Sequence, residues 1–282
     1  MLGAHTVTDP HIASFVVESG EQSRFLQTSP EFAMKKLLAH DSGPIYNLGP
    51  AFRSGEIGGH HSPEFTMLEW YRPGFDLGQL QLEVSSLIEY LGQHFALDIP
   101  EPLIASYSSL FKQRFSINPH IADTQALKSI IAAVFPDHSG HLEGYLEGQD
   151  EGEKDDLLDL LFALGIEPTL QAPQFVTGFP ESQASLARVG TVAGDRVALR
   201  AELYWQGIEL ANGYDELRDG NELRTRMARD NRIRLARGLP QIAPDEALLE
   251  ALPKIPPCAG IALGVDRLLM LLLAKRQLAD VL

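Results

Sequence analysis

Apolar residues follow a helical spacing in two early parts of the chain. They recur every three or four positions in residues 32–38 and 77–97, which predicts two amphipathic helices. Ser29 suits the N-cap of the first helix, and Pro30 suits its first helical position. Both helices should therefore turn one apolar stripe toward a protein core.

Strand-like segments surround these helices. They share short lengths, β-branched or aromatic residues, and bounding glycine or proline residues. These segments are 45–49, 64–71, 175–179, 196–214 and the first half of 258–274. The second half of the last segment follows Gly264 and predicts a buried helix.

The order of these elements predicts one α+β domain over residues 1–282. More helical pattern runs from 106 to 164, which we interpret as a helical insertion at approximately 106–170. The acidic run 147–156 within it is typical of solvated surface. No internal repeat or low-complexity linker divides the chain.

The strand at 64–71 carries two acids among large apolar residues. Alternate residues of a strand share a face, so Glu69 and Tyr71 point one way while Glu64 and Trp70 point the other. An unpaired carboxylate buried under a covered sheet costs several kcal/mol. Glu69 therefore needs a cation, which is either a ligand ammonium or a basic side chain of the protein.

The segment AELYWQGIEL predicts a β-hairpin that turns at Gln206-Gly207. In that register Tyr204 faces Glu209, and Glu202 lies one diagonal step away on the same face. Two carboxylates so placed can converge on one divalent ion, and oxygen ligands suit Mg²⁺ whose shell is completed by phosphates. Two acids on a solvated hairpin face are the alternative, and the spacing alone does not choose between them.

Two arginines extend this pattern toward a nucleotide site. Arg53 precedes a glycine-rich loop at 54–62, and Arg267 begins the last helix just after Gly264. The guanidinium fork matches phosphate oxygens, and glycine lets a ligand approach the backbone closely. The loop contains no dinucleotide fingerprint and no P-loop, which disfavours Rossmann and P-loop folds.

Composition narrows the class of protein. With 44% hydrophobic and 22% charged residues, the chain is typical of a soluble globular protein. Its net charge of -15 argues against a broad electrostatic grip on nucleic acid. The single cysteine, Cys258, excludes an internal disulfide. The N-terminus has no signal-peptide pattern, and Asp266 and Arg267 break the longest apolar run, so we expect a cytoplasmic protein without membrane contact.

Several blocks resemble a known family. FRSGEIGGHHSPEFTMLEWY resembles motif 2 of the class II aminoacyl-tRNA synthetases, and GIALGVDRLLML resembles their motif 3. The similarity is closer to the paralogues of lysyl-tRNA synthetase that act as elongation factor P (R)-β-lysine ligases, through TSPEFAMKKLL, FPESQASLA, GIELANGYDEL and DNRIRLARGLPQ. The resemblance implies an antiparallel sheet flanked by helices, without an anticodon-binding OB-fold domain.

The resemblance also implies an activity. Members activate (R)-β-lysine, or lysine, with ATP and Mg²⁺ as an acyl-adenylate, and transfer the acyl group to a lysine side chain of elongation factor P. The alternatives are a truncated lysyl-tRNA synthetase-like protein that charges tRNA, and a catalytically inactive ligand-binding remnant. The acidic charge disfavours tRNA. The resemblance begins after motif 1, the family's homodimer element, so we expect a fragment, an internal start, or a chain without that element.

The resemblance finally implies site residues. The expected catalytic residues are Arg53 at the α-phosphate, Glu209, and Arg267 at the terminal phosphates. The expected ATP-binding residues are Arg53, Ser54, Gly55, Glu56, Ser62, Glu202, Leu203, Gly264 and Arg267. The expected substrate-binding residues are Ser29, Pro30, Glu31, Glu69, Tyr71, Glu209, Asn212 and Glu216, and Glu202 and Glu209 are the expected Mg²⁺ ligands. Ser54-Gly55 replaces the Asn-Glu pair of lysyl-tRNA synthetases.

Overall fold

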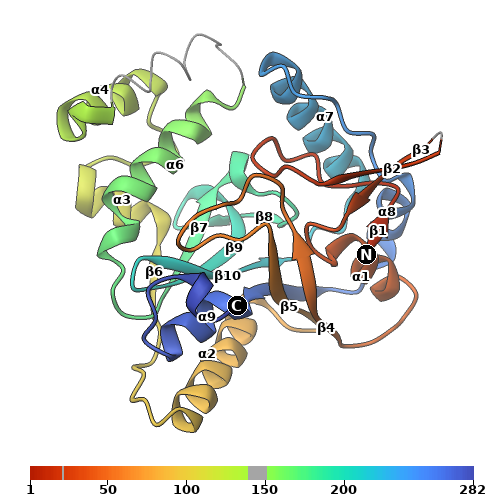
Figure 1. Cartoon of the computed structure of the whole chain (residues 1–282). Helices are drawn as coiled ribbons and strands as arrows, with labels where there is room; N and C mark the ends of the chain where they lie inside the picture. Colours follow the sequence, from red (N-terminus) through yellow and green to blue (C-terminus); the bar gives the residue numbers. More distant parts are fainter. Residues whose placement is uncertain (21, 139–150) are drawn as a thin grey trace.

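The computed structural model describes residues 1–20, 22–138 and 151–282, and an eight-stranded sheet lies at its centre (Figure 1). The strand order is β4-β5-β11-β10-β9-β7-β6, with β8 paired to β9, and every pairing except β6–β7 is antiparallel. The strands are β4 (Ile45–Phe52), β5 (Glu64–Pro73), β6 (Leu103–Ser106), β7 (Gln174–Pro180), β8 (Val189–Val192), β9 (Asp195–Trp205), β10 (Ile208–Asp215) and β11 (Cys258–Gly264). This confirms the α+β prediction.

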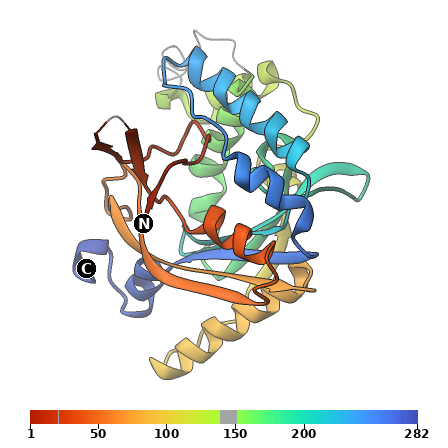
Figure 2. The same cartoon turned by 90° about the vertical axis from the view of Figure 1, so that its right-hand side faces the viewer.

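Helices and a small second sheet surround the large sheet. The small sheet has the order β1-β3-β2, from β1 (Leu2–Gly3), β2 (Val16–Ser19) and β3 (Gln22–Leu26). The helices are α1 (Glu31–Leu38), α2 (Leu77–His94), α3 (Tyr107–Phe115), α4 (Thr124–Val134), α6 (Glu153–Gly165), α7 (Gly220–Ala236), α8 (Glu246–Ala251) and α9 (Val265–Leu272). In Figures 1 and 2, α2 lies below the sheet, while α6 and α7 lie above it.

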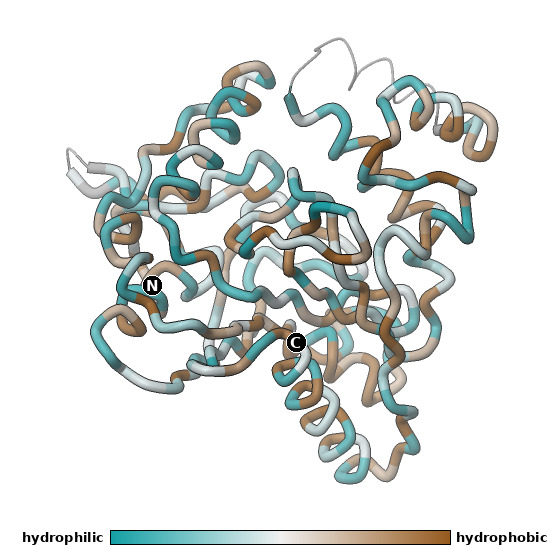
Figure 3. The backbone as a smooth tube through the Cα atoms, turned by 180° about the vertical axis from the view of Figure 1, so that it is seen from behind, coloured by the Kyte–Doolittle hydropathy of each residue, from teal (hydrophilic) through white to brown (hydrophobic). Residues whose placement is uncertain are grey.

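One face of the sheet packs against α2 and α9. Asp76 caps α2 with a full capping box, and Leu80, Val84 and Ile88 then form its buried stripe. These side chains share a core cluster with Leu203 of β9 and residues of β11 and α9. Figure 3 shows the resulting alternation of apolar and polar turns along α2, at the bottom of the view.

The opposite face carries two separate apolar clusters. Helices α3, α4 and α6 pack on β7 and β9 in one cluster, and α1, α7 and α8 pack around Tyr71 of β5 in the other. The three insertion helices fall inside the predicted 106–170 segment, and the division of the chain into one domain with an insertion stays a prediction. The first four residues of the acidic run, 147–150, lie outside the described residues.

The first helix departs from its prediction in two ways. It begins one residue later, because Pro30 takes the N-cap position, while Ser29 Oγ accepts a 3.4 Å hydrogen bond from the Glu31 N–H. Leu37 of the predicted apolar stripe is 56% exposed, whereas Lys35 is completely buried. A charged residue thus occupies a core position that the hydrophobic pattern assigned elsewhere.

No helix in the described ranges 1–20, 22–138 and 151–282 is both long enough and apolar enough to cross a bilayer.

Candidate active site

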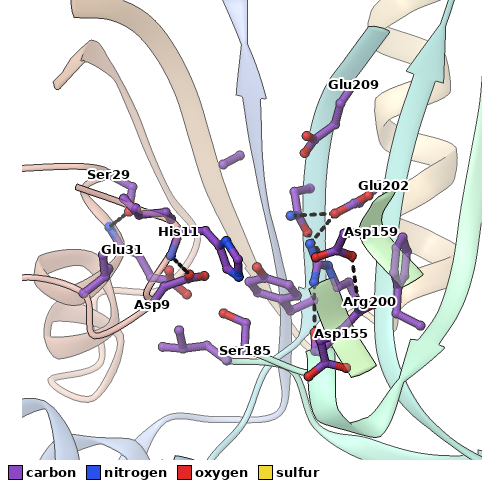
Figure 4. Close-up of a pocket in the computed structure, with 18 of the residues that line it drawn as sticks. Asp9, His11, Ser29, Glu31, Asp155, Asp159, Ser185, Arg200, Glu202 and Glu209 are labelled. Carbon is purple, nitrogen blue, oxygen red and sulfur yellow. Dashed lines mark hydrogen bonds and ion pairs between the residues drawn. The ribbon is translucent and has the colours of Figure 1, made fainter. Parts of the chain in front are cut away.

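A cavity of about 1260 Å³ opens above the uncovered middle of the sheet. Figure 4 shows its walls, with Ser29 and Glu31 on one side and Arg200, Glu202 and Glu209 on the other. Most of the residues expected from the sequence line this one cavity: Ser29, Glu31, Arg53, Glu56, Ser62, Glu69, Tyr71, Glu202, Glu209, Asn212, Glu216, Gly264 and Arg267. The sheet therefore gathers residues from β5, β9, β10 and β11 at one place.

Strand register arranges the cavity floor in two rows. The first row runs through the cross-strand partners Glu69, Ala262, Asn212 and Glu202. The second row, one step along the strands, contains Tyr71, Gly260, Tyr214 and Arg200. In both rows, large polar side chains stand at the sides and small residues of β11 stand between them, which leaves room above the floor.

Gly260 is one of these small residues, and the sequence analysis did not single it out. A Cβ atom there would lie 2.4 Å from the Tyr71 ring and 2.5 Å from Glu216 Oε1. The available signal was the alternation of glycine and alanine in CAGIALG, which keeps every second position of β11 small. That alternation keeps Tyr71 and Glu216 close together.

Glu69 carries an unpartnered oxygen at the cavity. Its side chain is 2% exposed, and Tyr71 Oη donates a 2.7 Å hydrogen bond to Oε1. Oε2 has no hydrogen-bond partner among the described residues. Burial and the nearby Glu31 raise the pKa of Glu69 to about 8. Glu69 Oε2 is therefore available to pair with a cationic ligand.

Lys35 is a cation that the sequence analysis missed. Its Nζ lies 2.7 Å from Glu31 Oε1 and 2.6 Å from Glu216 Oε2. Burial alone would lower the pKa of Lys35, but Glu216 and Glu31 raise it above its ordinary value. Burial raises the pKa of Glu216 to about 7, against the opposing effect of Lys35. Glu31 and Glu216 thus already have a basic partner from the protein, whereas Glu69 forms no ion pair with any residue that the structure describes.

The hairpin forms as predicted at its turn and then departs. Trp205 pairs with Ile208, and Tyr204 pairs with Glu209. A β-bulge follows, so that Asn212 lies opposite Glu202. Glu202 accepts hydrogen bonds from Arg200, from Asn212 Nδ2 at 3.0 Å and from Tyr204 Oη at 2.5 Å.

Glu209 is the more available of the two expected metal ligands. Burial and the neighbouring Glu202 raise its pKa to about 7, opposed by Arg267. A divalent cation would relieve this repulsion, so the charge of Glu209 fits such an ion. Both oxygens of Glu202 already accept hydrogen bonds. No cluster of three or more potential metal ligands occurs within the part of the chain that the structure describes.

The two expected arginines reach the cavity from different elements. Arg267 donates 3.0 and 2.9 Å hydrogen bonds to the backbone oxygens of His60 and Glu209. Arg53 lies over the Phe65 ring, 5.1 Å from its centroid, and contacts Glu56 at 3.4 Å. Neutral carbonyls and a ring hold most of these contacts, so the positive charges stay available for an anion.

Four expected residues do not line the cavity. They are Pro30, Ser54, Gly55 and Leu203. The Leu203 side chain is fully buried on the α2 face of the sheet, so it cannot reach a ligand in the cavity. The alternation of strand residues explains this position, because Leu203 lies between the cavity residues Glu202 and Tyr204.

Other lining residues had no signal in the sequence. Arg200 contacts Glu202, and its guanidinium lies 4.7 Å from the Phe179 ring centroid. His11 Nε2 lies 3.2 Å from Asp156 Oδ1, which joins the N-terminal loop to α6 and raises the pKa of His11. The contacts of Arg200 with Phe179 and of His11 with Asp156 join segments distant in sequence, so local patterns do not reveal them.

Comparisons with known proteins agree with this geometry. The family model described as tRNA synthetases class II (D, K and N) matches residues 4–282. A protein of Enterobacter sp. (strain 638) named elongation factor P–(R)-beta-lysine ligase is 45% identical over 286 residues, covering 98% of this chain and 84% of that protein. A protein of the same name from Proteus mirabilis (strain HI4320) is 44% identical over 291 residues, covering 100% of this chain and 85% of that protein.

Proposed function

The chain belongs to the class II tRNA synthetase family, and from that premise we propose that it ligates (R)-β-lysine, or lysine, to elongation factor P. Membership of this ligase class implies the use of ATP. The names of relatives that align with nearly the whole chain support the amino acid and the acceptor protein. A lysine side chain of elongation factor P is the proposed acceptor.

One observation carries the proposal: the cavity has a cationic end and an anionic end at a suitable separation. Arg53 lies over Phe65, and Glu69 follows four residues later on the same strand. At 3.3 Å per residue these positions are about 13 Å apart. A linear diamino acid joined to a nucleotide phosphate fits this order of charges, with its ammonium groups near Glu69 and its phosphate near Arg53.

The first step forms an acyl-adenylate. A carboxylate oxygen of the amino acid attacks the α-phosphorus of ATP, and the bond from that phosphorus to pyrophosphate breaks. Arg53 neutralises the α-phosphate and Arg267 the terminal phosphates. Such a site works by positioning the reactants and neutralising their charge, because side chains of the protein take little part in proton transfer.

The second step forms an amide. The neutral ε-amine of the acceptor lysine attacks the acyl carbon, the bond to the AMP oxygen breaks, and the nitrogen releases a proton. Glu31, Glu69, Tyr71, Asn212 and Glu216 hold the amino acid throughout both steps. Asn212 is oriented for this task by Glu202, which accepts a hydrogen bond from its amide.

Glu209 is the proposed main ligand of Mg²⁺ beside ATP, and Glu202 assists it. The raised pKa of Glu209 supports a cation at this place. When bound, the ion would neutralise phosphate charge. Ser62, Glu56 and Gly264 also line the cavity, and we assign them to the proposed ATP site.

Pyrophosphate exchange and acyl transfer test the proposal together. We expect ATP–pyrophosphate exchange that depends on (R)-β-lysine or lysine, followed by transfer of labelled acyl group to purified elongation factor P. Transfer to tRNA in place of elongation factor P would favour a lysyl-tRNA synthetase-like activity. ATP binding without any exchange would favour an inactive remnant.

A further inference from the structure

Four charged side chains meet in the corner of the cavity around Lys35. Three acids meet there: Glu31 from α1, Glu69 from β5 and Glu216 just after β10. Lys35 is buried between Glu31 and Glu216. Together the three carboxylates and one ammonium leave two formal negative charges, which is the opposite of a ligand with two ammonium groups.

The location of Lys35 is fixed by its partners. It lies one helical turn after Glu31, so both side chains share a face of α1. Its side chain is 0% exposed, and an unpaired ammonium would not remain buried there. The contact with Glu216 ties α1 to the end of β10, next to the close approach at Gly260.

We propose that Lys35 is a positioning residue that orients Glu31 and Glu216 and sets the charge of this corner to match an amino acid with two ammonium groups. The proposal rests on the proposed function, since it concerns how the same substrate is held. Lys35 acts through the two carboxylates, and it has no contact with the reacting atoms.

A purely structural ion pair is the competing explanation. Buried ion pairs contribute little net stability compared with apolar residues of the same size, so stability alone is weak evidence for the role of Lys35. The two explanations differ in their pH dependence. Lys35 lowers the pKa values of both Glu69 and Glu216, so its removal favours protonated carboxylates, which cannot pair with ammonium groups.

The other titratable groups that face this corner are few. Burial raises the pKa of Tyr71 on β5 well above its ordinary value and that of Tyr214 on β10 to about 12. On β11, burial raises the pKa of Cys258 to about 12. Asp215 adjoins Glu216 and pairs with Arg188 at 2.6 Å. Glu69 and Glu216 are therefore the groups whose protonation changes between pH 6.5 and 9.

The test is direct binding of (R)-β-lysine, measured by titration calorimetry at pH 7 and pH 9. We expect Lys35→Met to weaken binding about tenfold at pH 7 and less than about threefold at pH 9, because a pKa rise of one unit corresponds to tenfold. An equal loss at both pH values would overturn the charge-setting role. Lys36→Met is the matched control: Lys36 pairs with Asp245 at 2.7 Å and does not line the cavity.

A second variant pair covers the case in which Lys35→Met does not fold, as judged by thermal unfolding. In the Glu31→Gln background one negative charge of the corner is already gone, so the further change Lys35→Met should weaken binding by less than about threefold at pH 7. A tenfold loss in that background would overturn the proposal. Absence of binding by the wild-type protein would instead contradict the proposed function.

Discussion

The two ends of the cavity hold their charges in different ways. At the anionic end, which is the proposed amine end, Lys35 is held by Glu31 and Glu216, so opposite charges neutralise one another before any ligand arrives. At the cationic end, which is the proposed phosphate end, Arg267 is held by two backbone carbonyls and forms no ion pair with any described residue. Carbonyl dipoles fix a guanidinium without neutralising it. The charge of Lys35 is therefore neutralised by carboxylates of the protein, whereas the charge of Arg267 stays available for a polyanion.

The largest expected loss of activity follows from removing the charge of Arg53 at the proposed phosphate end. Arg53→Ala should lower ATP–pyrophosphate exchange by at least about a thousandfold, the range seen for arginines that stabilise transferring phosphoryl groups. Exchange kinetics with saturating amino acid measure this. Arg224→Ala is the matched control, because Arg224 pairs with Glu246 at the surface. An exchange rate of Arg53→Ala within tenfold of the wild-type rate would contradict the assignment of Arg53 to the α-phosphate.

The second largest loss of exchange is expected for Glu209, which lies near Arg267 and Arg53. Glu209→Gln keeps the shape of the side chain and removes its charge, so we expect about a hundredfold loss of exchange with unchanged thermal unfolding. Added Mg²⁺ should not restore the rate. Glu250→Gln, at an exposed position of α8, is the control. Wild-type rates in Glu209→Gln would contradict the metal assignment.

At the amine end, the crowded Gly260 offers a steric test. Gly260→Ala places a methyl group against Tyr71 and Glu216, and we expect a loss of about 1–3 kcal/mol in the free energy of unfolding. Binding of (R)-β-lysine should also weaken. Gly59→Ala serves as a stability control, since a Cβ there meets no atom within 4 Å. Equal urea midpoints for the two variants would mean that the site tolerates the methyl group.

The raised pKa of Glu69 predicts how stability and amino acid affinity depend on pH. A carboxylate whose pKa is raised in the folded state takes up a proton that the unfolded chain has released, so the stability of the free protein should fall as pH rises from about 5 to about 8. Affinity for (R)-β-lysine should rise over pH 7 to 8, as Glu69 loses its proton. Melting curves with and without the amino acid measure both trends, and Glu69→Gln should flatten them.

The smallest expected effect is that of Tyr71→Phe. It removes the 2.7 Å hydrogen bond to Glu69 Oε1 and keeps the ring. A hydrogen bond to a charged group contributes about 1.5–3 kcal/mol, so affinity for the amino acid should fall by roughly tenfold, at the low end of that range. The loss should exceed that of Tyr46→Phe, at an exposed position of β4. Identical affinities in the two variants would contradict a role for the hydroxyl.

The sequence predicted features with a short, regular period. The alternation in 64–71 correctly separated Glu69 and Tyr71 from Leu68 and Trp70, because strand faces repeat every second residue. The hairpin turn was correct because Gln206-Gly207 accommodates two positive φ angles. Most of the residues predicted from the resemblance line the cavity, and their chemical roles remain proposals.

Features that depend on distant partners were not predictable in this way. The burial of Lys35 requires Glu216, which follows much later in the chain, so the helical pattern chose Leu37 for the core instead. The bulge after Glu209 has no local signature, and it moves Asn212 opposite Glu202. Leu203 was assigned to ATP on resemblance, although the strand period places its side chain in the core.

The position of β11 has a consequence for how the protein matures during synthesis. This strand is the last of the sheet to be translated, yet it lies between β5 and β10. A nascent chain that emerges from the ribosome N-terminus first would have all its other strands available while the middle of the sheet is still missing. The floor of the cavity, with Gly260 against Tyr71 and Glu216, is therefore complete only after β11 has emerged, and chains that stop before β11 lack this part of the site.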